Sequence, residues 1–427
     1  MKRTRFAIVL VALALIAAAC GGGDDSAGST VTTQPTESTV APAAESASLQ
    51  IIGPWRATEA DAFELVLDGF RETSGVEVVY EGVDDVLAPL STRIAAGSPP
   101  DLAVLPTGNG LLDFAAQGAL VPLDFMQDEL ASNFADGLLG AFSVDGTPYA
   151  FPTRADIGSA LWYNPAVVTE PPATWADFVA YCDSMAASGE ACVAGIGADG
   201  WTLDMLFAVI YTASYGAAQN TALWAGDVPF TDPSVSAALE KMTTYYGADY
   251  AAGGPEGALG TGLVDGFARV FGENADATFV QAGSWGGGLA IGAVNENLVE
   301  GETIDYVMFP TESAGENASM VYSDVVVVLT DSPAARELAQ YLASTDGQTL
   351  FLESGYSVAN VHVDSSSETG LLGKTSGLLA TVDGTTELIS NDLKAQWIEL
   401  LGAVILDPST ISSQLEDFQS VAQDSLG

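Results

Sequence analysis

Short apolar segments alternate with amphipathic helical segments at the start of the chain's body, between residues 49 and 117. The segments 49–53, 76–80 and 101–105 are apolar enough to be buried on both faces, which is typical of strands in a parallel sheet. Helical spacing begins at Thr58, and Gly75 ends this first helix. A second helix begins at Asp84 or Asp85. This β-α-β-α-β order predicts an α/β fold with helices covering a parallel sheet.

The rest of the body continues the alternation without an internal repeat. Further strands are predicted at 148–152, 159–163, 193–197, 278–281, 306–309 and 325–329. Further helices are predicted at 175–187, 202–214, 233–246, 333–343, 392–404 and 409–422. About 380 residues of this kind are long enough for two lobes, each with its own core.

The first twenty residues are typical of an export signal. A basic stretch, 1–5, precedes an apolar stretch, 6–19, that is shorter than the ~20 residues of a permanent membrane helix. The small residues before Cys20 resemble the lipobox of bacterial lipoproteins, although Ala17 stands where that motif more often has Leu. We therefore expect a signal peptide at 1–19 and a lipid on Cys20. The alternative is an ordinary secreted protein with a spare thiol. Residues 20–48 then form a flexible, polar tether.

Acidic residues outnumber basic ones by 56 to 12, which gives a formal net charge of −44. Such a surface repels phosphates, so we expect no nucleic-acid partner. Such a surface could attract a cationic ligand, but carboxylates spread over a solvated surface are the better explanation of the charge.

Two cysteines and one histidine remain in the body. Cys182 and Cys192 are ten residues apart and flank a turn, so an extracellular location favours a disulfide, with two buried free thiols as the alternative. A single histidine, His362, cannot build a site from a His pair. The glycines at 286–288 lack the sequence context of a phosphate-binding loop. We expect neither a metal site nor a cofactor.

Several segments taken together resemble the extracellular solute-binding proteins of ABC importers, in the branch that binds maltose, α-glucosides and related sugars. The segments that carry the resemblance are 63–80, 96–103, 115–123, 161–165, 174–178, 229–233 and 283–285. The resemblance implies a type II periplasmic-binding-protein-like fold, in which two hinged α/β lobes close over a ligand. It places the crossings between lobes near 149–155, 306–310 and 358–364. Lobe one is then 49–151 plus 310–362, and lobe two is 152–309 plus 363–427.

A sugar presents flat C–H faces and a rim of hydroxyl groups, which suit aromatic rings and charged or amide side chains respectively. The expected stacking residues are Trp55, Trp201, Trp285, Tyr356 and Trp397. Trp55 follows the first strand, at the edge where open α/β sheets bind ligands. Trp285 lies on a glycine-rich loop, and the family position favours Trp285 and Trp397. The spacing of Trp162 and Trp175 indicates core positions instead.

Five charged residues are the expected hydroxyl partners: Asp85, Arg154, Asp156, Asp204 and Asp324. Asp324 interrupts an apolar strand, where a buried carboxylate needs partners. Each of the others has a structural alternative. Arg154 and Asp156 can form a mutual ion pair, Asp85 can cap its helix, and Asp204 can be a solvated charge in a first helical turn.

These observations predict a monomeric binding protein that performs no chemistry. It is lipid-anchored at the outer face of the bacterial cell membrane, where it captures a sugar, an α-glucoside or oligosaccharide, and delivers it to permease subunits. One alternative keeps the fold but binds a polyamine, an iron chelate or a compatible solute. Another is an anchored glycoside hydrolase that uses two carboxylates.

Overall fold

The structure, a computed structural model, describes residues 48–134, 136–144, 146–313, 315–386 and 388–426. The expected signal peptide, the lipid attachment at Cys20 and nearly all of the tether lie outside the described residues. Within the described ranges, no helix combines the length and the apolar character that crossing a membrane requires.

The first lobe contains a five-stranded sheet with the strand order β2-β1-β3-β13-β6. Its strands are β1 (Leu49–Gly53), β2 (Val78–Gly82), β3 (Leu102–Leu105), β13 (Val325–Val328) and β6 (Ala150–Pro152). The first three are parallel, as the sequence predicts. Strand β13 runs antiparallel to both β3 and β6, so the complete sheet is mixed.

Helices cover this sheet and bury their apolar stripes against it. They are α1 (Thr58–Ser74), α2 (Leu87–Ala95), α3 (Leu111–Ala116), α4 (Gln127–Asn133), α5 (Asp136–Ala141), α13 (Pro333–Ala343) and α14 (Thr345–Glu353). Phe63 and Phe70 of α1 lie in the same apolar cluster as Ile51 and Val104. Helix α1 ends where Gly75 adopts a φ of 72°, a left-handed conformation that glycine adopts without strain.

The second lobe contains a four-stranded sheet with the strand order β11-β8-β10-β9. Its strands are β11 (Asp305–Met308), β8 (Ala160–Tyr163), β10 (Phe279–Ala282) and β9 (Val193–Ala194). A disulfide joins Cys182 to Cys192, with the Cα atoms 5.1 Å apart, and both residues are buried in the core of this lobe.

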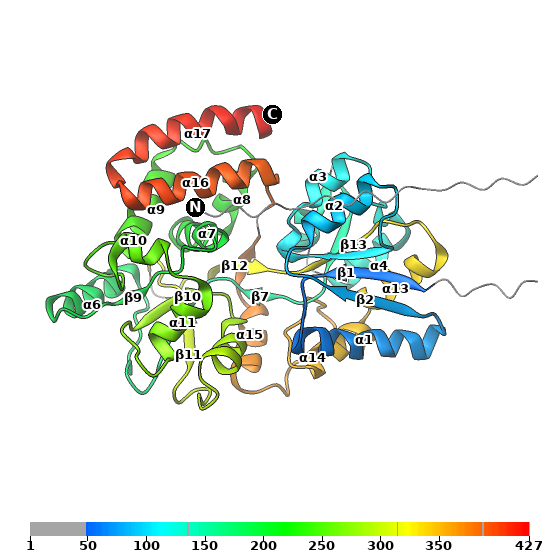
Figure 1. The fold of residues 1–427 in the computed structure, drawn as a ribbon, viewed down its shortest axis with the longest axis horizontal. Helices are drawn as coiled ribbons and strands as arrows, with labels where there is room; N and C mark the ends of the chain where they lie inside the picture. Colours follow the sequence, from blue (N-terminus) through cyan, green and yellow to red (C-terminus); the bar gives the residue numbers. More distant parts are fainter. Residues whose placement is uncertain (1–47, 135, 145, 314, 387, 427) are drawn as a thin grey trace, which may run out of the picture. The chain divides into compact units, whose positions relative to one another are not determined.

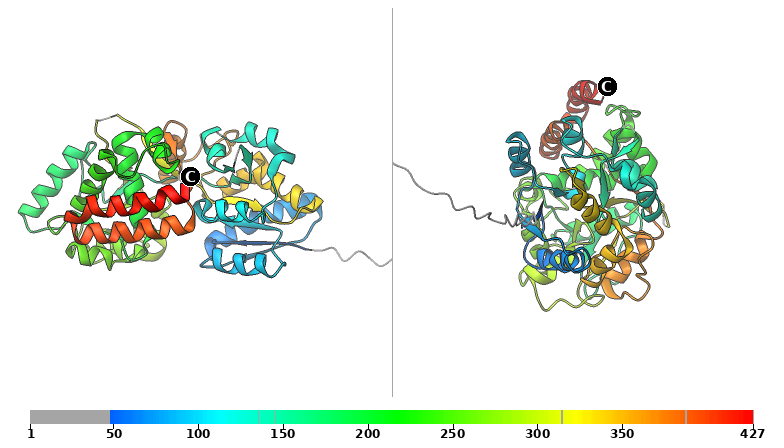
Figure 2. Two further views of the ribbon diagram at one scale, coloured as in Figure 1. Left: turned by 90° about the horizontal axis from the view of Figure 1, so that it is seen from above. Right: turned by 90° about the vertical axis from the view of Figure 1, so that its right-hand side faces the viewer.

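The second lobe is the more helical one. Its longer helices are α6 (Trp175–Ala187), α7 (Trp201–Tyr215), α8 (Ala217–Trp224), α9 (Pro233–Tyr245), α11 (Leu263–Phe271), α15 (Gly370–Leu379), α16 (Asn391–Leu406) and α17 (Ile411–Leu426). Helix α7 is buried along nearly its whole length. Figure 1 shows α16 and α17 side by side beyond α7, and Figure 2 shows the same pair from above.

A three-stranded sheet lies between the lobes, where β12 and β7 are labelled in Figure 1. Its strands are β7 (Asp156–Ile157), β12 (Ala318–Tyr322) and β14 (Asp383–Thr385), in the order β14-β12-β7. The first crossing leads from β6 into β7, within the predicted segment 149–155. The third crossing returns the chain from the first lobe to the second. It lies between Ala359, which with Val358 packs on the first lobe, and the start of α15.

The second crossing differs from the expected position near 306–310. Strand β11 pairs with β8 and therefore remains in the second lobe. Met320 of β12 still lies in the core of that lobe, where its sulfur accepts a hydrogen bond from the Thr212 hydroxyl at 3.2 Å. The chain reaches the first-lobe sheet only after Asp324, so residues 310–322 belong with the second lobe and the hinge sheet rather than with lobe one.

Candidate functional site

A cavity of about 470 Å³ lies between loops of the first lobe and helices of the second. Its first-lobe wall comes from two short segments, 84–87 and 106–109, which follow β2 and β3. Both segments therefore lie beyond the carboxyl ends of parallel strands, the edge at which open α/β sheets bind ligands. The volume falls in the range of about 300–1,000 Å³ that is usual for small-molecule sites.

Two indole rings form the apolar part of the second-lobe wall. Trp201 begins α7 and keeps 40% of its surface exposed, while Trp285 immediately precedes α12 (Gly286–Leu289). Their ring centroids are 6.1 Å apart and their planes are tilted by 50°. The two rings together therefore offer an angled apolar surface at the cavity.

The glycines around Trp285 allow close packing. The Trp285 ring folds back over Gly283 so closely that a Cβ atom there would collide with it. Trp162 donates a hydrogen bond from Nε1 to the Gly283 carbonyl at 3.0 Å, and its ring also leaves no room for a Cβ atom at Gly286. Local packing therefore requires glycine at 283 and 286, whereas a Cβ atom at Gly288 would meet no neighbouring atom.

An ion pair forms the polar part of the same wall. Asp204, only 1% exposed on α7, pairs through Oδ2 with Lys394 Nζ of α16 at 2.9 Å. Its other oxygen, Oδ1, has no hydrogen-bond partner among the described residues. Lys394 Nζ also donates to Asn109 Oδ1 of the first lobe at 3.4 Å. This lysine therefore contacts both walls of the cavity.

Two exposed carboxylates line the first-lobe wall, and each already has a partner. Asp84 forms an ion pair with Arg56. Asp85 accepts hydrogen bonds through Oδ1 from the backbone N–H groups of Leu87, at 3.0 Å, and Ala88, at 3.4 Å. Asp85 thus caps the first turn of α2, the structural alternative considered from sequence, while also lining the cavity.

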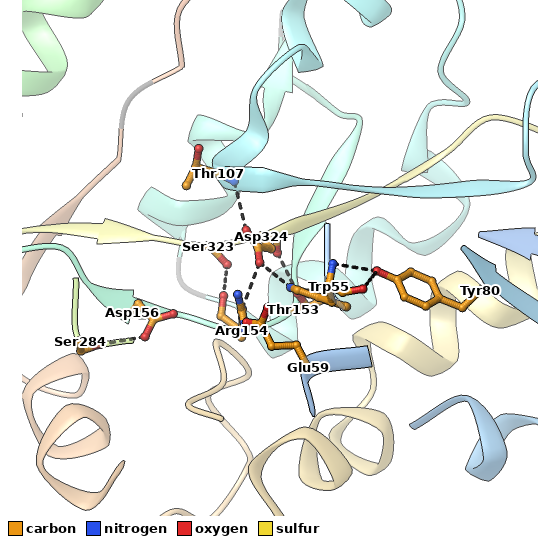
Figure 3. Close-up of polar contacts among 10 residues, drawn as sticks. All are labelled: Trp55, Glu59, Tyr80, Thr107, Thr153, Arg154, Asp156, Ser284, Ser323 and Asp324. Carbon is orange, nitrogen blue, oxygen red and sulfur yellow. Dashed lines mark hydrogen bonds and ion pairs between the residues drawn. The ribbon is translucent and has the colours of Figure 1, made fainter. Parts of the chain in front are cut away.

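Asp324 is the centre of a hydrogen-bond network at the hinge (Figure 3). Its Oδ2 accepts from Trp55 Nε1 at 2.8 Å and from Arg154 Nε at 3.0 Å, and its backbone carbonyl accepts from the Thr153 N–H and hydroxyl groups. Arg154 also pairs with Glu59 through Nη1 at 2.7 Å. The network therefore joins the first crossing to the second through a nearly buried charge pair.

The same network reaches the cavity through Thr107. Asp324 Oδ1 accepts a hydrogen bond from the Thr107 backbone N–H at 3.3 Å. Thr107 lines the cavity and has a φ of 50°, a left-handed conformation that is strained for a β-branched residue. Strain of this kind persists only where surrounding contacts impose it, and it often occurs at ligand sites.

The charges of the network shift the pKa values of its members. Burial lowers the pKa of Arg154, but Asp324, Glu59 and Asp156 outweigh burial, so the guanidinium is held charged. Burial raises the pKa of Asp156, and neither Arg154 nor a hydrogen bond from the Ser284 hydroxyl, at 2.8 Å, cancels that effect. Arg154 forms its ion pairs with Asp324 and Glu59, not with Asp156 as the sequence alternative supposed.

The structure brings four of the predicted ligand residues to the cavity: Asp85, Trp201, Asp204 and Trp285. Asp204 is a buried, paired charge and not a solvated one. Five others lie in or beside the hinge network and are not among the cavity's lining residues: Trp55, Arg154, Asp156, Asp324 and Tyr356. The Arg154 guanidinium lies 5.4 Å from the Trp55 ring centroid and 5.3 Å from that of Tyr356, so both aromatic rings pack against this charge.

Trp397 is the one predicted ligand residue that lies neither at the cavity nor in the hinge network. Its ring is fully buried and packs against Phe207, Trp224, Phe230 and Phe418 in the second-lobe core. The expected ligand contact is therefore wrong for Trp397, because α17 covers the face of α16 that carries it. Lys394, one turn earlier on α16, lines the cavity instead.

Five polar residues that line the cavity were not predicted as ligand residues: Asp84, Thr107, Asn109, Tyr322 and Lys394. Basic residues are scarce in this chain, so each of them was informative. The signal for Lys394 was available, because Asp204 lies in the first turn of a mostly apolar helix and a buried carboxylate requires a cation. Among the described residues, no group of three or more His, Cys, Asp or Glu side chains is arranged to hold a metal ion.

Two curated proteins are similar to this chain over about two thirds of its length. The osmoprotective compounds-binding protein GgtB of Synechocystis is 29% identical over 316 residues, which cover 69% of this chain and 72% of that protein. The alpha-glucosides-binding periplasmic protein AglE of Rhizobium meliloti is 29% identical over 328 residues, which cover 69% and 68%.

Solved structures share the fold. The bacterial solute receptor AcbH, described as preferring β-D-galactopyranose, superposes with a TM-score of 0.71 at 21% identity, covering 89% of this chain and all of that one. The cyclic α-maltosyl-1,6-maltose binding protein of Arthrobacter globiformis gives 0.67 at 18% identity, covering 89% and 98%. Both support a two-lobe, type II periplasmic-binding-protein fold. The family profile described as "bacterial extracellular solute-binding protein" matches residues 56–349, so the chain belongs to this family of ABC-importer components.

Proposed function

We propose that this protein captures a small carbohydrate or a related polyol outside the cell and passes it to the permease subunits of an ABC importer. The observation that carries the proposal is the combination of two indole rings with ionic and amide groups in one cavity. Indole rings suit the C–H faces of a sugar, and charged groups form the stronger hydrogen bonds to its hydroxyls.

Closure of the lobes is the proposed capture step. The cavity takes its walls from both lobes, and the lobes are connected by short crossing segments that include β7 and β12. A few residues at such crossings can absorb the dihedral changes of a hinge motion. A ligand bound to both walls then favours the closed arrangement, because it makes its full set of contacts only there.

The relatives suggest two classes of ligand. The similarity to AglE supports an α-glucoside or short oligosaccharide, which is the first candidate. The similarity to GgtB supports an osmoprotective compound, the compatible-solute alternative considered from sequence. A neutral α-glucoside that also serves as a compatible solute, such as trehalose, satisfies both indications, and we place it first.

We further propose that Cys20 carries a lipid and that the protein acts as an anchored monomer at the outer face of the cell membrane. The basic and apolar sequence before Cys20 supports this, as does the polar sequence that follows it. Mass spectrometry of protein recovered from the membrane fraction tests the attachment. A diacylglycerol on Cys20 is expected, whereas an unmodified thiol would contradict the proposal.

The binding experiment is titration calorimetry with trehalose, maltose, sucrose, glucosylglycerol and raffinose, and with spermidine and a ferric chelate as the other ligand classes. At least one neutral glycoside should bind and raise the unfolding temperature, because a ligand that binds only the folded state stabilises it by about 2.7 kcal/mol at 100 times its Kd. Binding of spermidine or the chelate alone would reject the proposal.

The same samples test the hydrolase alternative. After prolonged incubation with the protein, each α-glucoside should be recovered intact by chromatography. Release of glucose at a rate proportional to protein concentration would assign an enzymatic function instead.

A further inference from the structure

Each carboxylate at the cavity already has a positive or N–H partner in the structure. Asp84 pairs with Arg56, Asp85 caps α2, and Asp204 pairs with Lys394. This arrangement is unexpected in a chain with a formal net charge of −44, where an acidic cleft would arise without any special placement of charge. Each of these carboxylates is therefore compensated locally, two of them by a cation and Asp85 by backbone N–H groups.

The pairs differ in how strongly water screens them. The Arg56 and Asp84 side chains are 57% and 77% exposed, so their charges contribute little to the cavity's field. The Lys394 and Asp204 side chains are 18% and 1% exposed. Charges in such surroundings interact much more strongly than charges in water, so the ammonium–carboxylate pair dominates the electrostatics of this wall.

Lys394 is also the one basic side chain among the described residues that line the cavity. Without its ammonium group, the Asp204 carboxylate would remain buried beside two indole rings with no cation. Its Oδ1 atom already lacks a hydrogen-bond partner. A ligand ammonium group would then be the most favourable replacement, since an uncompensated buried charge is strongly unfavourable.

We propose that Lys394 determines the charge specificity of the site. By occupying the position that a ligand ammonium group would take, it restricts this very acidic protein to uncharged polyhydroxylated ligands and excludes amino sugars and polyamines. Asp204 is a positioning residue that holds Lys394. The formal net charge of −44 over the whole protein disfavours anionic sugars. This inference rests on the proposed function, because it specifies the ligand class of the same cavity.

The test uses three ligands with one carbon frame: trehalose, 6-amino-6-deoxytrehalose and trehalose 6-phosphate. The wild-type protein should bind trehalose at least tenfold more tightly than either charged analogue. Lys394→Met keeps most of the apolar stem but removes the charge. In this variant, the preference for trehalose over the amino analogue should shrink at least tenfold or reverse.

Two further variants separate charge from damage to the fold. Adding Asp204→Asn to Lys394→Met removes the unpaired carboxylate and should restore the preference for trehalose over the amino analogue. Lys241→Met is the matched control, because Lys241 is 19% exposed, pairs with Glu312 and lies over the ring of Trp175, away from the cavity. Its affinity ratios should equal those of the wild type. A ratio of affinities also discounts a uniform loss of binding caused by partial misfolding.

Several results would overturn the inference. Wild-type protein that binds the amino analogue as tightly as trehalose lacks the proposed selectivity, although the proposed sugar-binding function would stand. An unchanged preference in Lys394→Met, or a double variant that behaves like the single one, removes Lys394 from this role. If no sugar binds to the wild-type protein, the proposed function fails first and the inference fails with it.

Discussion

Replacing Asp324 by asparagine tests whether the hinge depends on a charge pair or only on shape. Asparagine has nearly the same volume, so the change removes the charge and one acceptor position without creating a cavity. Arg154 and Asp324 have side chains that are 14% and 11% exposed, and Asp324 also accepts from Trp55 and Thr107. The substitution therefore leaves a nearly buried guanidinium with one carboxylate partner fewer.

The magnitude follows from that geometry. Removing one partner of a buried ion pair costs about 3–5 kcal/mol of stability. Glu59 still pairs with Arg154, although its own side chain is 39% exposed and its charge is partly screened. We therefore expect a loss at the lower end of the range, about 3 kcal/mol. Arg154→Met should cost a similar amount, because it leaves the Asp324 carboxylate without its cation.

The assay is urea unfolding followed by both far-UV circular dichroism and tryptophan fluorescence. Asp331→Asn is the matched control, because Asp331 also pairs with an arginine, Arg336, but both side chains are largely exposed. This control should leave the unfolding midpoint unchanged. In the double variant of Asp324 and Arg154, the loss should fall short of the sum of the single losses by about 2 kcal/mol, as expected for directly coupled residues.

Two results would refute this reasoning. If Asp324→Asn shifts the midpoint no more than Asp331→Asn does, the pair adds no stability beyond that of a surface pair. If the losses of the two single variants simply add, the two residues act independently and the network is not a unit.

Three further predictions concern Trp285, Asp156 and the Cys182–Cys192 disulfide. Trp285→Ala should weaken binding of a neutral glycoside by roughly 1–3 kcal/mol in calorimetry. Tyr215→Ala is the control and should leave binding unchanged, because Tyr215 is 40% exposed but lies outside the cavity. Equal losses in the two variants would reject Trp285 as a stacking residue. Because burial raises the pKa of Asp156, charging this residue opposes folding as pH rises above the ordinary value of 3.8. Asp156→Asn should therefore raise the unfolding temperature at neutral pH, and the gain should disappear at acidic pH; a gain that grows on acidification would contradict the sign. Replacing both Cys182 and Cys192 by serine should lower the free energy of unfolding in urea by roughly 2–3 kcal/mol, as expected for a loop of this length. If the variant is still less stable than the wild type when both are measured under reducing conditions, the loss comes from packing and not from the disulfide.

The sequence was a good guide wherever local pattern and burial agree. Apolar runs at 49–53, 101–105 and 325–329 became β1, β3 and β13, because a strand buried on both faces must be apolar throughout. Helices with clear stop signals were also placed closely, as α1 and Gly75 illustrate. The crossing near 306–310 was expected from the resemblance alone, and the sequence analysis did not predict β12. Only the pairing of β12 with β7 and β14 assigns residues 318–322 to the hinge sheet and places the crossing at Asp324.

At the candidate site, too, the sequence predicted some residues and not others. Trp201, Trp285, Asp85 and Asp204 reached the cavity, and each stands at a helix start or in a loop after a strand, positions that sequence can identify. Trp397 and Lys394 lie on one helix, and the sequence could not tell which of them faces the ligand. That choice depends on where α17 packs.

The order of apolar and polar residues by itself determined that the body is an α/β protein, because burial of apolar side chains depends mainly on local composition and periodicity. Only the tertiary structure decided which charges meet. Arg154 with Asp324, and Lys394 with Asp204, are joined across 170 and 190 positions of the chain. The interaction of such groups depends on their distance and on their removal from water, and neither quantity is set by the residues adjacent in sequence.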